Sequence, residues 1–206
     1  RLQFSARVHR LTAATCQELD DITVSIVGHL ARELGLPIHS RRLVFLPMKM
    51  GRLGMVPAST HGNAAFVASW AESAAAVARA VGQTSAEALL ANAPHIETAV
   101  DEALNACALN GASTRTFHEL LSSDRRKHQG ALCADINDRR SVNLLRDLSP
   151  DVQAIVRSGG GTGAGAWALL PTMRSHCLSD DAARIALRAR LLLAVCEDGA
   201  GCNHTT

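Results

Sequence analysis

The residues best suited to chemistry are two groups of basic side chains. Lys and Arg bind nucleic-acid phosphates by replacing the counterions condensed on them. The first group lies in an irregular segment, residues 36–57, which contains glycines and no acidic residue, so backbone amides there can also meet phosphates. The residues expected to contact phosphates are Arg41, Arg42, Lys49 and Arg52 in the first group, and Arg125, Arg126 and Lys127 in the second. The alternative interpretation of either group is an ordinary solvated surface.

Three potential zinc ligands lie close together near the end of the sequence, at Cys196, Cys202 and His204. A structural zinc site takes four ligands in a tetrahedron, usually Cys and His. These three have an unusual spacing and no fourth ligand follows them. We therefore expect no complete zinc site and no other cofactor. The three residues fit better as the beginning of a Cys/His module that continues beyond Thr206.

A glycine-rich run that begins at Gly159 raises the question of nucleotide binding. A phosphate-binding loop of the P-loop type needs a Lys and then a Ser or Thr after its last glycine, whereas Ala166 and Trp167 follow here. A dinucleotide fingerprint fits loosely as Gly161-x-Gly163-x-x-Ala166, but the alternating strands and helices that surround such a fingerprint are missing. The alternative of a nucleotide-dependent enzyme is therefore disfavoured, and we expect a connection between helices.

No set of residues identifies a catalytic centre. The nine His are widely spread, and none pairs with a Ser or Cys in a recognisable motif. Two-metal chemistry needs clustered carboxylates. The two Asp-Asp pairs, Asp20-Asp21 and Asp180-Asp181, suit the polar face and the N-terminus of predicted helices. We therefore predict a protein without enzymatic activity of its own.

The composition indicates a helical protein. Apolar residues make up 47% of the 206 residues, but aromatic residues only 3%, and Tyr is absent. A core of Leu, Ala, Val and Ile is typical of helices. The formal net charge of +2 excludes a uniformly basic nucleic-acid coat, but not a local basic surface. No stretch reaches the roughly 18 apolar residues of a membrane span. The six scattered Cys suit buried thiols in an intracellular, reducing compartment.

Hydrophobic periodicity predicts an all-α fold of about seven helices, with one irregular Pro/Gly-containing basic segment near the N-terminus. In the first helix Ile22, Ile26, Val27 and Leu30 recur at helical spacing opposite acidic residues. The irregular segment carries a short apolar run, residues 43–46, that suits a strand. The expected helices are 12–35, 58–82, 86–91, 94–109, 114–127, 132–148, a short one after 149, and 179–195. The predicted N-cap residues are Ser85, Ser149 and Ser179.

Three groups of short sequence segments, which we call islands, stand out along the chain. They are LPMKMGRLGM at 46–55 with AAFVASW at 64–70, SGGGTGAGAW at 158–167 with LPT at 170–172, and LSD at 178–180 with ALRARL at 186–191. In this order they resemble the region that follows the polymerase core in LINE-like (non-LTR) retroelement reverse transcriptases. In that family a Cys/His knuckle comes next.

The resemblance implies a helical region beside a template–primer duplex and no catalytic centre. It divides the chain into a thumb-like helical region, 1–150, and a second region, 151–206, with the Gly-rich connection, the last helix and the incomplete Cys/His segment. The polymerase signature of an aromatic residue, any residue and two Asp is absent, because Glu18 and Leu19 precede Asp20-Asp21. Arg52 interrupts the paired glycine of the family.

We therefore expect a non-catalytic helical nucleic-acid-binding region derived from a retroelement reverse transcriptase, with RNA or DNA as its partner. The alternative is a structural subunit of a large assembly, including a ribonucleoprotein, with no activity of its own. In that alternative the helical surfaces, rather than the basic residues, contact the protein partners.

Overall fold

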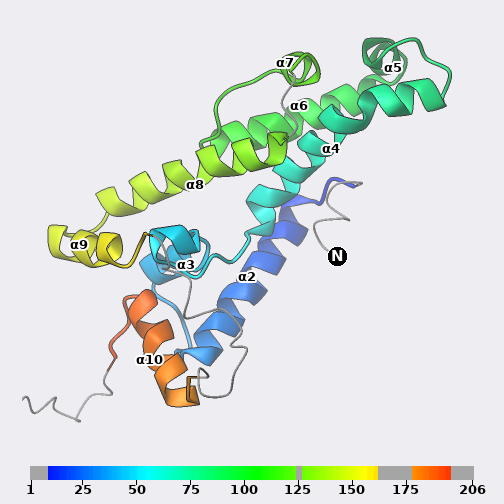
Figure 1. Ribbon diagram of the computed structural model, residues 1–206. Helices are drawn as coiled ribbons and strands as arrows, with labels where there is room; N and C mark the ends of the chain where they lie inside the picture. Colours follow the sequence, from blue (N-terminus) through cyan, green and yellow to red (C-terminus); the bar gives the residue numbers. More distant parts are fainter. Residues whose placement is uncertain (1–8, 124–126, 162–177, 196–206) are drawn as a thin grey trace, which may run out of the picture. The chain divides into compact units, whose positions relative to one another are not determined.

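The computed structural model describes residues 9–123, 127–161 and 178–195. In these residues the fold is all-α (Figure 1), which confirms the expected fold class, and no strand is found in the described part. None of the described helices has the length and apolar character that a membrane span requires. The elements are α2 (Ala13–Leu30), α3 (Ile38–Val44), the 3-10 helix η1 (Met48–Met50), α4 (Ala58–Ala80), α5 (Ala86–Asn92), α6 (Pro94–Leu109), α7 (Phe117–Leu121), α8 (His128–Arg146), α9 (Pro150–Ser158) and α10 (Asp180–Arg190).

The chain divides into two compact units, and each is built from separate stretches of sequence. Among the described residues, unit 1 holds 9–20, 56–123 and 127–143. Unit 2 holds 21–55, 144–161 and 178–195. The sequence-based division instead placed a single boundary near residue 150. Helices α2 and α8 each contribute residues to both units.

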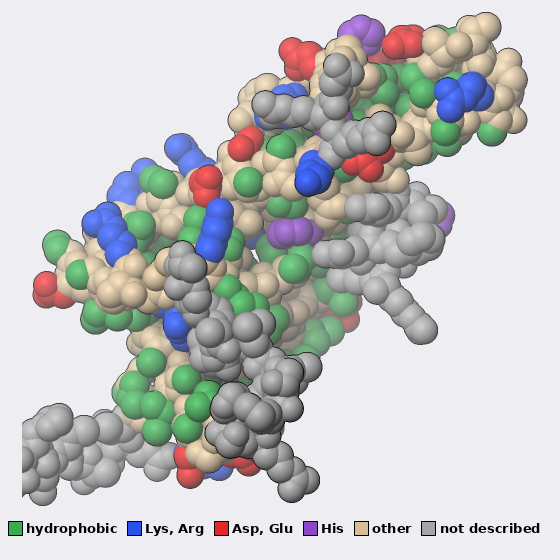
Figure 2. All heavy atoms as spheres, viewed as in Figure 1, with side chains coloured by type: hydrophobic (Ala, Val, Ile, Leu, Met, Phe, Trp, Pro, Cys, Tyr) green, Lys and Arg blue, Asp and Glu red, His purple; other side chains and the backbone are tan. Residues whose placement is uncertain are grey.

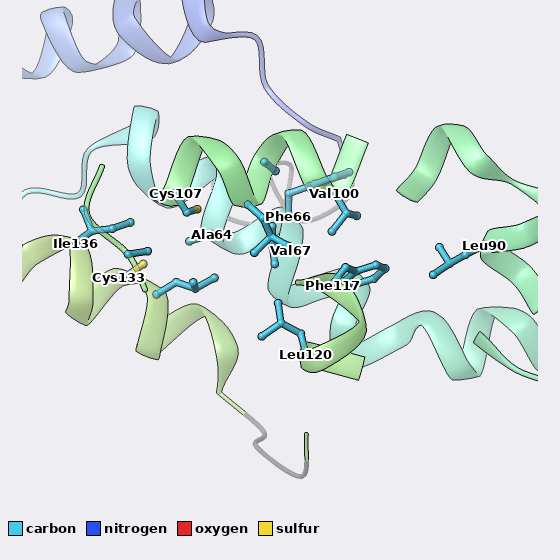
Figure 3. Close-up of a cluster of buried hydrophobic side chains, with 14 residues drawn as sticks. Ala64, Phe66, Val67, Leu90, Val100, Cys107, Phe117, Leu120, Cys133 and Ile136 are labelled. Carbon is cyan, nitrogen blue, oxygen red and sulfur yellow. The ribbon is translucent and has the colours of Figure 1, made fainter. Parts of the chain in front are cut away.

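Unit 1 is organised around α4, which packs against α5, α6 and α7. Small residues fill the buried side of α4, and Ala64, Ala65 and Ala68 are almost completely buried there. Because alanine has a short side chain, neighbouring helices can approach α4 closely, as the sequence predicted. Figure 3 shows the core: its buried residues include Phe66 and Val67 of α4, Val100, Leu104 and Cys107 of α6, Phe117 and Leu120 of α7, and Leu132, Cys133 and Ile136 of α8.

Side-chain caps determine where several helices begin. Ser85 and Ser179 accept hydrogen bonds of 3.2 Å from Ala88 N and Ala182 N, so both predicted caps are confirmed. Ser149 stands at the N-cap of α9, but its side chain makes no cap hydrogen bond. Thr116 and Glu119 form a capping box that starts α7. That helix is therefore shorter than the predicted 114–127.

The buried side of α2 within unit 2 differs from the sequence expectation. Val24 and Val27 are buried, and Ala31 just after the helix is buried with them. Ile22 and Ile26, which the apolar pattern included, are 49% and 55% exposed. The helix carries two apolar rows, so its periodicity alone cannot show which row faces the core.

The irregular segment also differs from expectation, because residues 38–44 form the helix α3. Pro37 stands at its N-cap, where the fixed φ of proline suits a helix start. Within the supposed strand, Leu43 and Val44 end the helix and are buried. They belong to the core of unit 2, whose buried residues are Val24, Val27, Ala31, Leu36, Leu43, Val44, Leu46, Leu53, Leu144 and Leu191.

Candidate functional site

The most constrained part of unit 2 is a contact between glycine-containing segments, which we call the glycine junction. It comprises residues 48–54, Gly159–Gly161 after α9, and Arg190 of α10. A Cβ atom on Gly51 would lie 2.2 Å from the carbonyl carbon and oxygen of Gly159. Gly51 also has a φ of +78°, which favours glycine. The two backbones therefore touch at this point.

Hydrogen bonds hold the glycine junction together. Gly161 N donates to Lys49 O at 2.8 Å. Arg190 Nη1 donates to Gly159 O at 2.7 Å, and Arg52 Nη1 donates to Arg190 O at 3.0 Å. Arg190 and Arg52 thus meet carbonyls at the C-terminal ends of α9 and α10, where the helix dipole is negative. Both arginines have a structural role at helix ends.

Arg52 is the most unusual residue of the junction, because only 2% of its surface is exposed. Nε and Nη2 of its guanidinium are buried and have no hydrogen-bond partner in the described part of the chain. Burial, and after it the positive charge of Arg190, lowers the pKa of Arg52 to about 10. The side chain is therefore still charged at neutral pH. This placement corrects the expectation of a surface residue at position 52.

The buried guanidinium of Arg52 makes too few hydrogen bonds to offset the cost of removing its charge from water. A buried donor without a partner costs about 1–3 kcal/mol, and more when the group is charged. One hydrogen bond to a carbonyl offsets only part of the desolvation of a cation. The sequence supplies no acid nearby along the chain: residues 34–71 and 152–179 contain neither Asp nor Glu.

The backbone carbonyls of Lys49 and Arg157 both accept hydrogen bonds from the glycine segment. Gly160 N donates to Arg157 O at 3.1 Å, and the next residue, Gly161, donates to Lys49 O. Both side chains are exposed. Neither makes an ion pair or side-chain hydrogen bond within the residues that the structure describes. Sequence reasoning identified Lys49 but missed Arg157, because Arg157 is far from the first basic group in sequence.

Arg41 and Arg42 of α3 are both engaged in ion pairs. Arg41 Nη2 lies 2.5 Å from Asp21 Oδ1, and Arg42 Nη1 lies 2.6 Å from Asp147 Oδ2. All four side chains are about half exposed, and exposed pairs of this kind contribute little stability. Phosphate oxygens can therefore replace these carboxylates at small cost.

The structure describes one residue of the second predicted basic group and none of the predicted zinc ligands. Lys127 is exposed, whereas Arg125 and Arg126 lie outside the described residues. The possible zinc ligands, Cys196, Cys202 and His204, also lie outside them. Within the described ranges, no three His, Cys, Asp or Glu side chains come together as a metal site.

A pocket of about 270 Å³ lies beside α2 in unit 2. Its ionisable side chains include Asp21, His29, Glu33 and Arg41. Asp21 pairs with Arg41, and Glu33 lies 3.5 Å from Nη1 of Arg188. The pocket therefore presents carboxylates that already have basic partners, and it contains none of the residues of the glycine junction.

Unit 1 contains a buried acidic side chain that sequence reasoning assigned to a solvated face. Asp20 of α2 is 7% exposed and accepts hydrogen bonds from Ala58 N at 2.6 Å and Ser59 N at 3.2 Å. These are the first amides of α4, whose own N-cap, Pro57, offers no side-chain acceptor. Asp20 therefore caps α4 from another helix, a role that local sequence cannot reveal.

Burial makes two thiols in the core of unit 1 unreactive. Burial raises the pKa of Cys107 to about 12 and that of Cys133 to about 11. A thiol must ionise to act as a nucleophile or a metal ligand. Both residues therefore act as small core side chains, as the sequence indicated for the scattered cysteines.

Comparison with known proteins adds no relative: no protein-family model, no curated protein and no solved structure matches this chain.

Proposed function

We propose that this protein is a non-catalytic helical region that binds nucleic-acid phosphates through unit 2, and that it derives from a retroelement reverse transcriptase. The observation that carries the proposal is the gathering of basic residues around the glycine junction, within sequence that lacks acidic residues. The resemblance of the three sequence islands supports the ancestry, and it remains a resemblance.

Positive charge is concentrated in unit 2. Its stretches of sequence, 21–55 and 144–206, hold 11 Lys and Arg against 8 Asp and Glu. The stretches of unit 1, 1–20 and 56–143, hold 10 against 11. The overall charge of +2 therefore conceals a basic unit and a nearly neutral one. Figure 2 shows Lys and Arg side chains over the C-terminal half of α8, a helix that contributes residues to both units.

The contacts within the junction also join parts of the three islands that carry the resemblance. Lys49 and Arg52 belong to the first island, Gly159 and Gly161 to the second, and Arg190 to the third. The hydrogen bonds between them make these distant segments one local structure.

Lys49 and Arg157 are the residues best placed for phosphate contacts, because both are exposed and unpaired among described residues. Arg41 and Arg42 add contacts when phosphates replace Asp21 and Asp147. Two to four contacts of this kind predict weakly sequence-dependent binding, with log K falling by about 2–4 per tenfold rise in salt concentration.

Charge reversal tests the role of Lys49 directly. The full-length chain and its Lys49→Glu variant are titrated against labelled RNA–DNA, DNA and RNA duplexes, and fluorescence anisotropy gives Kd. We expect Lys49→Glu to weaken binding several-fold, and Lys49→Glu with Arg157→Glu to weaken it further. Arg79→Glu, an equal charge change at an exposed site of α4 in unit 1, is the matched control. Equal losses at positions 49 and 79, or no loss at either, would overturn the proposal.

A second function, as a subunit of a larger assembly, is favoured by one surface of α2. Ile22, Ile26 and Leu30 are exposed by 49–62%, and their spacing of four residues places them on one side of the helix. Such a row is typical of a surface that contacts another protein. Under this function, replacement of Ile26 with Lys prevents co-purification with the partner chains and leaves duplex binding unchanged.

A further inference from the structure

We propose that the buried guanidinium of Arg52 binds a phosphate dianion inside unit 2. This inference goes beyond the binding of nucleic-acid backbones and does not depend on it, because the ligand is a phosphate group enclosed by the fold. The argument rests on which nitrogen atoms of Arg52 lack partners, on the charges near them and on the backbone that surrounds them.

The two nitrogens without partners are the pair that recognises oxyanions. In a guanidinium group, the N–H bonds of Nε and Nη2 point in parallel from one edge of the plane. That edge matches two oxygens of a phosphate or carboxylate in a two-pronged hydrogen bond. In Arg52 these two atoms are buried and unpartnered, whereas Nη1 is already bound to Arg190 O. The free edge is thus complete and preorganised.

The local charge favours a dianion over a single carboxylate. Arg190 lies close enough to lower the pKa of Arg52, and the backbone carbonyls of Lys49 and Arg157 accept hydrogen bonds from the glycine segment. Four acidic residues of unit 2 form ion pairs with arginines other than Arg52; these are Asp21, Glu33, Asp147 and Asp181. Asp151 and Asp180 stand in the first turns of α9 and α10. A phosphate dianion carries enough charge for Arg52 and for one of the exposed cations Lys49 and Arg157.

Among the described residues, the glycine segment leaves open space at Gly161. A Cβ atom on Gly159 would lie 3.5 Å from Arg190 Nη1 and one on Gly160 would lie 3.1 Å from Lys49 O, whereas one on Gly161 would meet no described residue within 4 Å. The 2% exposure of Arg52 keeps the middle of a nucleic-acid strand away from its guanidinium. The phosphate is therefore either a free ion or the terminal phosphate of a strand.

Inorganic phosphate tests the site in the full chain. Thermal unfolding is followed at increasing phosphate, with chloride adjusted to keep the ionic strength constant. We expect Tm to rise by about 3 °C or more when phosphate reaches ten times its Kd. The rise should disappear in Arg52→Met and remain in Arg146→Met, which removes an exposed charge from the end of α8. An unchanged Tm in the wild-type chain would overturn the proposal even if Arg52→Met does not fold.

The source of the phosphate is determined by a second comparison. A short oligonucleotide with a 5′-phosphate is compared with the same oligonucleotide with a 5′-hydroxyl. A several-fold preference for the 5′-phosphate that is lost in Arg52→Met assigns the site to a strand end. Stabilisation by inorganic phosphate without that preference assigns it to the free ion. An Arg52→Met variant that is more stable than wild type in both the presence and the absence of phosphate would refute the site.

Discussion

Gly51 is the position where a single methyl group should do most damage to unit 2. Replacing it with Ala has two effects, and the structure separates them. The first is the backbone cost of a φ of +78°, which for a residue with a Cβ is about 1–2 kcal/mol. The second is the collision of the new Cβ with Gly159, at 2.2 Å from two backbone atoms.

The collision should cost more than the backbone strain. Because backbone atoms cannot rotate away, Gly51 and Gly159 must separate by about 1 Å to restore ordinary contact. That movement breaks the hydrogen bond from Gly161 to Lys49, worth about 1 kcal/mol, and the charged one from Arg190 to Gly159, worth about 1.5–3 kcal/mol. We therefore expect Gly51→Ala to lower the free energy of unfolding by about 3–6 kcal/mol.

Two other glycines with positive φ serve as controls that lack the collision. Gly82 has a φ of +75° and Gly161 a φ of +102°, and a Cβ at either would meet none of the described residues within 4 Å. Gly82→Ala and Gly161→Ala should each cost about 1–2 kcal/mol. Urea unfolding followed by far-UV circular dichroism gives the three values. A cost at Gly51 no larger than at the two controls would refute the close backbone contact at the glycine junction.

Three further predictions concern unit 1. Asp20→Ala should lower the free energy of unfolding, measured in urea, by about 2–4 kcal/mol, because two amides of α4 lose their acceptor. The neighbouring change Asp21→Ala should lower it by under about 1 kcal/mol, and equal losses would contradict the long-range cap. Thr116→Ala should lower the free energy of unfolding by about 1 kcal/mol, because the capping box of α7 is lost, whereas Thr114→Ala should change it very little. Urea unfolding measures both variants, and a larger loss in Thr114→Ala would exclude the cap. Finally, the pKa values of Cys107 and Cys133 are raised in the folded protein, so as pH rises these thiols ionise in the unfolded chain first, near the ordinary thiol pKa of 9.0. The buried thiols therefore contribute fully to stability below pH 9.0, and this contribution falls as pH rises towards 11. Tm should therefore decline more steeply with alkaline pH in wild type than in the double variant Cys107→Ala, Cys133→Ala, and parallel declines would contradict the thiol burial.

Local sequence signals predicted the elements whose causes are local. The caps at Ser85 and Ser179 mark helix starts because each side chain reaches an amide three residues on. Pro94 begins α6 because its missing N–H costs nothing in a first turn. The small residues of α4 indicated a central helix, and α4 indeed packs against three others.

Features that depend on distant parts of the chain escaped sequence reasoning. Asp20 caps a helix that begins 38 residues later, and nothing near Asp20 in sequence indicates that partner. Arg52 was expected to contact phosphates as one of a basic group, but it is buried and its Nη1 donates to Arg190 O, 138 residues further along the chain. Arg157 joined the site only when the fold brought Gly161 to Lys49.

The salt dependence of duplex binding tests the central claim most directly. The Kd of the full chain for an RNA–DNA duplex is measured between about 50 and 200 mM salt. Two to four phosphate contacts in unit 2 predict that Kd rises by roughly 12- to 150-fold over this range, and by less in Lys49→Glu with Arg157→Glu. A Kd that does not change with salt, or the same slope in the wild type and the double variant, would contradict the account.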